Sequence, residues 1–75
     1  MTKEQAIKFK REYVKLYNNV KEGNFTKEQK QQLANSFYRA YYKLSQSFVN
    51  EKDRETQIAK GELLDIATKL LIELE

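Results

Sequence analysis

Apolar side chains recur in this chain at alternating spacings of three and four residues, in three separate segments. That spacing places them on one face of an α-helix, because a helix turns once every 3.6 residues. The three stripes consist of Ala6, Phe9, Tyr13, Leu16 and Val20; of Ala34, Phe37, Tyr41, Leu44 and Phe48; and of Ala59, Leu63, Ile66 and Leu70. The sequence therefore predicts an all-α fold of three amphipathic helices.

Two of the helices have clear start signals. The tetrapeptide Thr-Lys-Glu-Gln occurs at residues 2–5 and again at 26–29, and in both places it has the form of a capping box at a helix N-terminus. Gly23 is a suitable helix stop, since glycine readily takes the left-handed conformation that closes a helix. We predict helices over residues 3–21 and 27–49, and the short connection between them makes the second helix an antiparallel neighbour of the first.

The third helix is predicted over residues 54–74, but its beginning is less well marked. Residues 50–55 contain neither glycine nor proline, so they form either a polar turn, with Asn50 or Asp53 as the helix cap, or a continuation of the second helix. A continuous helix would give a long hairpin that needs a partner to bury its apolar face. Gly61 is unfavourable inside a helix, so either a neighbour approaches closely there or the helix begins nearer residue 62.

A chain of 75 residues forms one domain, which we take as residues 1–75, with a thin margin of stability. It contains no cysteine and no histidine, so disulfides and the usual structural metal sites cannot supplement the core. The expected architecture is an antiparallel three-helix bundle. A homodimer that pairs the second or third helix across a two-fold axis would complete the core of this bundle.

Charge is distributed unevenly along the chain. Residues 1–49 carry ten basic and four acidic side chains, a formal +6, whereas residues 50–75 carry four basic and seven acidic ones, a formal −3. One interpretation is electrostatic pairing between the basic and acidic helices of a single bundle. The other is a basic surface that meets an acidic partner.

The composition argues against an enzyme. Without histidine and cysteine, the commonest general base and the strongest nucleophile are absent, and no activating group is evident for Ser36, Ser45 or Ser47. The chain has no glycine-rich phosphate loop and no calcium-loop pattern. We therefore expect no catalysis, no cofactor, no metal and no small-molecule substrate.

Protein binding through a helix face is the leading functional hypothesis, for a small regulator, inhibitor or immunity-type protein. Aligned apolar and aromatic residues away from the main stripes often mark docking surfaces. The candidates for contact with another protein are Ile7, Val14, Tyr17, Tyr38 and Tyr42. An alternative for the first two is that they pack against the third helix.

The alternative function is binding of DNA or RNA as an accessory protein, because residues 37–43 interleave aromatic and basic side chains as base stacking and phosphate contacts require. The candidate contacts are Lys8, Arg11, Lys15, Arg39 and Lys43. We favour a protein partner, since Phe37 and Tyr41 belong to the apolar stripe. Membrane binding is not expected, and the absence of an apolar N-terminal stretch favours a cytoplasmic location.

Overall fold

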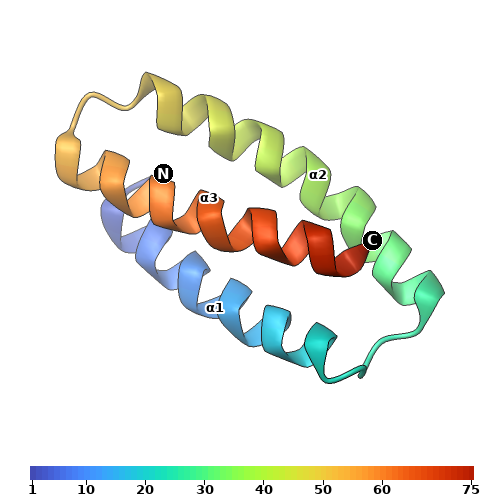
Figure 1. The fold of residues 1–75 in the computed structure, drawn as a ribbon. Coiled ribbons are helices and arrows are strands. Elements are labelled where there is room, and N and C mark those ends of the chain that lie inside the picture. The colour runs from blue at the N-terminus through green and yellow to red at the C-terminus, as the bar shows by residue number, and fades with distance from the viewer.

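The computed structural model describes all 75 residues and contains three helices, without strands: α1 (Lys3–Lys21), α2 (Lys27–Asn50) and α3 (Arg54–Leu74). Helices α1 and α3 run in the same direction and α2 runs opposite to both (Figure 1). The predicted all-α three-helix bundle is confirmed, and α2 extends one residue beyond its predicted end.

Both predicted capping boxes are present. The hydroxyls of Thr2 and Thr26 accept hydrogen bonds from the backbone N–H groups of Gln5 and Gln29, at 3.2 and 3.1 Å. Each glutamine side chain in turn accepts the backbone N–H of its threonine, so two N–H groups are satisfied at each helix start. Gly23 has a φ of +80° and directs the chain from α1 towards α2.

A genuine turn separates α2 from α3. Glu51 is in an extended conformation, and Asp53 caps α3 by accepting the backbone N–H of Thr56 at 3.0 Å. The same carboxylate also accepts the Thr56 hydroxyl, and these two hydrogen bonds are the main reason that the pKa of Asp53 is lowered. The continuous helix considered for residues 50–55 is therefore wrong.

A buried lysine ties this turn together. The side chain of Lys60 in α3 donates hydrogen bonds to the Glu51 carboxylate and to the backbone carbonyl of Ser47, the latter at 3.4 Å, and Lys60 is only 4% exposed. The Ser47 carbonyl is one of the last four in α2, which have no partner within a helix. Lys60 thus closes the end of α2, and its hydrogen bond to Glu51 is the largest cause of the lowered pKa of that carboxyl.

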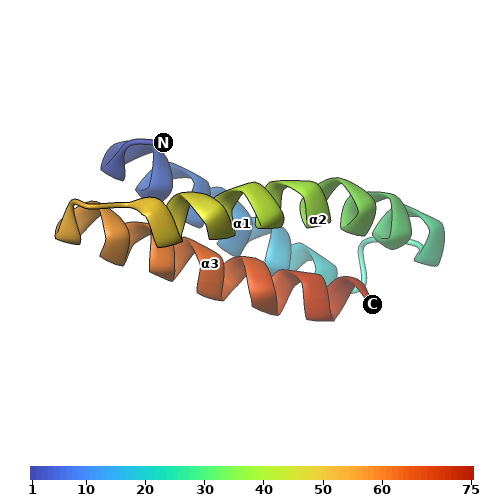
Figure 2. The ribbon, with the colours of Figure 1, turned by 90° about the horizontal axis from the view of Figure 1, so that it is seen from above.

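Helix α3 is the central element of the fold. It packs against both α1 and α2, whereas those two helices make little contact with each other, and Figure 1 shows α3 running between them. Figure 2 shows that α1 is inclined to the other two helices. The predicted antiparallel direction of α2 is confirmed, but its expected close packing beside α1 is largely replaced by packing on α3.

The core lies along α3, and its two largest fully buried side chains are Leu63 and Leu70. Around each of them, buried residues from α1, α2 and α3 form one cluster. Gly61 lies inside α3, and an ideal Cβ there would be 3.3 Å from a ring carbon of Phe48. Of the two explanations for this glycine, close approach by a neighbour is the correct one.

Ion pairs join the basic first helix to the acidic third helix. Lys3 contacts Glu55 and Lys10 contacts Glu62, each with a nitrogen to oxygen distance of 3.1 Å. The electrostatic pairing inferred from the charge distribution is therefore present between α1 and α3. The side chains involved are substantially exposed, and such pairs orient helices more than they stabilise them.

Candidate functional site

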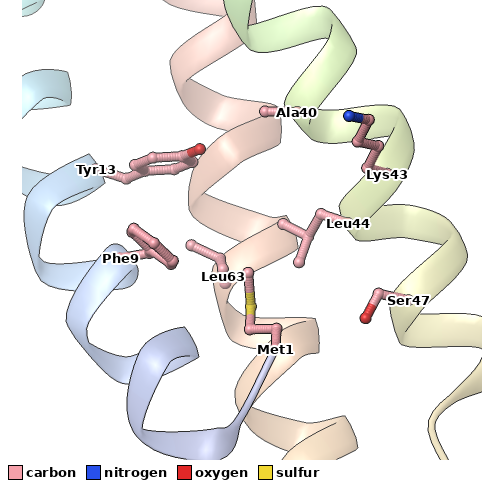
Figure 3. A pocket seen from close by; sticks show the side chains of 8 residues that line it. All are labelled: Met1, Phe9, Tyr13, Ala40, Lys43, Leu44, Ser47 and Leu63. Atoms are coloured by element: carbon pink, nitrogen blue, oxygen red, sulfur yellow. The ribbon is translucent and has the colours of Figure 1, made fainter.

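An apolar groove of about 390 Å³ opens between α1 and α2. Six of the eight side chains that line it are hydrophobic. The eight lining residues are Met1, Phe9 and Tyr13 on the α1 side, Ala40, Lys43, Leu44 and Ser47 on α2, and Leu63 on α3 (Figure 3). We call this feature the interhelical groove.

The groove exists because small side chains face it from α2. Ala40 and Ser47 do not reach far enough to fill the space between two helices that α3 holds apart. At one end, the ring of Tyr13 meets the edge of Phe37, with ring centroids 5.1 Å apart. Beyond this contact Phe9 is only partly covered and remains 37% exposed. Apolar surface of the groove is thus left in contact with water.

The polar groups of the groove are few. Burial raises the pKa of the Tyr13 hydroxyl, and the nearby charge of Glu12 raises it further, so this side chain is neutral across the physiological range. Lys43 forms no ion pair. The chain contains no group of three or more acidic side chains placed to hold a metal ion. Chemically, the groove suits an apolar segment with a negative charge near Lys43.

Two of the predicted protein contacts lie on a different flank of the molecule. Ile7 and Val14 border a shallow depression with Glu62 on the outer side of α1 and α3, and both are 37% exposed. Val14 also lines a neighbouring depression with Ile66. These two side chains therefore lie against α3 and also keep an accessible edge.

The three predicted tyrosine contacts do not form one surface. Tyr17 is half-buried against the core cluster around Leu70, and the ammonium of Lys21 lies 5.2 Å from its ring centroid. Tyr38 is exposed and donates a hydrogen bond to Glu75 at 2.8 Å, which is the main reason that its pKa is raised. Tyr42 is also exposed and lies one turn further along α2, so it shares a face of that helix with Tyr38.

The five predicted nucleic-acid contacts are free of ion pairs but are divided between two helices. Arg11 and Lys15 border the depression with Ile7, whereas Lys43 lines the interhelical groove. Their helices lie on opposite sides of α3 (Figure 1). Three of the five lie on α1 and two on α2: Lys8, Arg11 and Lys15 on the first and Arg39 and Lys43 on the second.

Sequence reasoning missed the interhelical groove because Phe9 and Leu44 belong to the apolar stripes and were expected in a closed core. Leu44 is indeed buried, whereas Phe9 is not. The one available signal was the small size of Ala40 and Ser47 on the same side of α2. Spacing along a helix shows which side chains share a face, but it does not show whether a neighbour covers that face.

The comparisons with known proteins find no match among family models, curated proteins or solved structures. None of the three helices combines the length and the apolar content needed to cross a membrane. Functional inference therefore rests on the geometry of the molecule itself.

Proposed function

We propose that this chain is a small, non-enzymatic regulatory protein that binds another protein through the interhelical groove. The observation that carries the proposal is the apolar groove between α1 and α2, which the side chains of the chain itself do not fill. Grooves between helices are a common way to bind the apolar face of another helix. The cytoplasmic location expected from the sequence forms part of this proposal.

The apolar side chains of the groove provide a driving force for binding. A phenylalanine presents about 200 Å² of surface, so covering the exposed third of Phe9 would remove roughly 70 Å² from water and contribute about 2 kcal/mol. Met1 is 47% exposed on the same side of the groove. An aromatic side chain in a concave surface, with an aliphatic neighbour, is typical of the residues that dominate binding energy at interfaces.

A second candidate function is nucleic-acid binding, which one observation favours. Lys8, Arg11, Lys15, Arg39 and Lys43 are all free of ion pairs and are available for phosphate contacts. Their division between two helices argues for weak, sequence-independent binding, which falls steeply as salt rises. Binding in the apolar groove depends much less on salt.

The two functions are separated by affinity purification from the native host with three baits, after nuclease treatment. The baits are the wild-type chain, Phe9→Gln in the groove, and Ile7→Gln as a matched control, because Ile7 lies on the same helix and has the same 37% exposure. We expect a protein partner to remain bound to the wild type and to Ile7→Gln and to be lost from Phe9→Gln. Equal recovery with all three baits, loss of the partner from Ile7→Gln rather than from Phe9→Gln, or loss of every partner on nuclease treatment, would contradict groove binding.

A further inference from the structure

The interhelical groove lies between the two basic helices of the molecule. Helix α1 carries six basic and two acidic side chains, and α2 carries four basic and one acidic. Of these ten basic groups only Lys3 and Lys10 form ion pairs, and both pair with α3. The two helices that border the groove therefore have a combined formal charge of +7, whereas the side chains that line the groove are mostly apolar.

The shape of the groove matches a short stretch of helix. On α2 its lining extends from Ala40 to Ser47, which is about two helical turns or about 10 Å. Apolar side chains at positions i, i+4 and i+7 of a bound helix cover the same length. A helix placed there would pack on both α1 and α2 and complete a four-helix bundle around the exposed edge of the core.

Resting on the proposed function, we propose that the occupant of the groove is an acidic amphipathic helix of a partner protein, with apolar side chains on Met1 and Phe9 and a carboxylate beside Lys43. Electrostatic complementarity of this kind selects the partner and accelerates association. The acidic side chains of the partner would pair with basic side chains of α1 and α2 that form no ion pair within the chain.

A second copy of this chain is a poorer occupant. If the grooves of two copies met face to face, α1 and α2 of one copy would lie against α1 and α2 of the other, and each such pair of helices has a formal charge of +7. Like charges across an interface oppose association. The acidic helix α3 does not offer the required pattern either. Its large exposed apolar residues are Ile58 and Ile72, four turns apart, with Asp65 and Lys69 between them.

The test uses three fluorescent helical peptides of about 14 residues, which span about 21 Å. All three carry leucine at i, i+4, i+7 and i+11. They differ in the flanking positions, which are glutamate in the first peptide, glutamine in the second and lysine in the third. Fluorescence anisotropy with the full chain should show binding in the order glutamate, glutamine, lysine. Affinity for the glutamate peptide should fall with added salt towards that of the glutamine peptide, because salt screens the exposed charges.

Variants assign the binding to the groove. Ala40→Leu, which fills the groove without removing a core side chain, and Phe9→Gln should each weaken the glutamate peptide at least tenfold, whereas Ile7→Gln should leave it unchanged. Lys43→Gln should weaken the glutamate peptide about two- to fivefold, as an exposed ion pair does, and leave the glutamine peptide unaffected. Far-UV circular dichroism verifies that each variant keeps its helices.

Several results would overturn the inference. The first is equal affinity for all three peptides, and the second is that none of them binds. The third is that Ala40→Leu still binds the glutamate peptide as the wild type does. The fourth is that sedimentation equilibrium shows a wild-type dimer that Phe9→Gln dissociates. If host partners still depend on Phe9 while the acidic peptide does not bind, groove binding stands and the acidic occupant is wrong. If neither depends on Phe9, both proposals fail.

Discussion

Gly61 offers a sharp test of how closely α2 and α3 pack. It lies inside α3, where glycine costs about 1 kcal/mol relative to alanine, so Gly61→Ala should stabilise the helix if the added methyl group fits. An ideal Cβ would lie 3.3 Å from Cε2 of Phe48 and 3.7 Å from its Cζ. The outcome therefore depends on whether the Phe48 ring can move by a few tenths of an ångström.

We expect the ring to move, because Phe48 is only partly buried. Each carbon contact is worth about 0.1–0.2 kcal/mol, so loosening a few of them costs about 0.5 kcal/mol. Against the helical gain of about 1 kcal/mol, this leaves a net stabilisation of about 0.5 kcal/mol. For a domain of this size, that corresponds to a rise in Tm of about 2–4 °C.

Urea unfolding and thermal melts followed by circular dichroism measure both quantities. In a Phe48→Leu background, Gly61→Ala should recover the full gain of about 1 kcal/mol, and the double-mutant cycle then gives a coupling of about 0.5 kcal/mol. Gly61→Val, whose branched side chain cannot avoid the ring, should instead destabilise the chain by about 1–3 kcal/mol. Destabilisation by Gly61→Ala of about 1 kcal/mol or more would refute the reasoning, because Phe48 would then be immobile.

Three further perturbations test the core, a cap and the α2–α3 turn. Leu70→Ala truncates a side chain with no exposed surface and should lower the free energy of unfolding, measured by urea titration, by about 2–5 kcal/mol. A decrease of less than about 1 kcal/mol would contradict the central place of Leu70 in the core. Thr26→Ala should cost about 1 kcal/mol, because it removes the hydroxyl that accepts the Gln29 N–H, whereas Thr26→Ser should be nearly neutral. The pKa of Glu51 is lowered in the folded state, chiefly by the hydrogen bond from Lys60, so its contribution is complete above the ordinary carboxyl pKa and is lost as the pH falls through the folded value. Between about pH 5 and about pH 3, the free energy of unfolding measured with urea should therefore fall less in Glu51→Gln than in the wild type. An equal fall in both proteins would count against a contribution of the Glu51 carboxylate to stability.

The helices could be predicted from the sequence because their determinants are local. A capping box needs only the residues at positions 2–5 or 26–29, and an apolar stripe needs only the helical repeat. Asp53 was one of two possible caps, and the sequence did not distinguish a turn from a continuous helix at residues 50–55. That choice depends on Lys60, whose contacts with Ser47 and Glu51 close the end of α2.

The candidate site was predicted less well than the fold. Ile7 and Val14 do share a flank. The five candidate phosphate contacts form no ion pair within the chain; they are Lys8, Arg11, Lys15, Arg39 and Lys43. Tyr17, however, is half-buried on α1 and apart from Tyr38 and Tyr42 on α2, and Phe9 is exposed in spite of its place on the stripe. Periodicity describes one helix at a time, whereas exposure depends on how three helices are arranged.

By itself, the sequence determined α1 and α2, the antiparallel direction of these two helices and the contrast between the basic first part of the chain and the acidic last part, since these follow from residue type and spacing. Only the tertiary structure decided that α3 would take the central position and hold α1 and α2 apart. Small residues such as Ala40 cannot fill the space this leaves, so an apolar groove opens between the two basic helices. The groove is a property of packing between helices, which no single helix encodes.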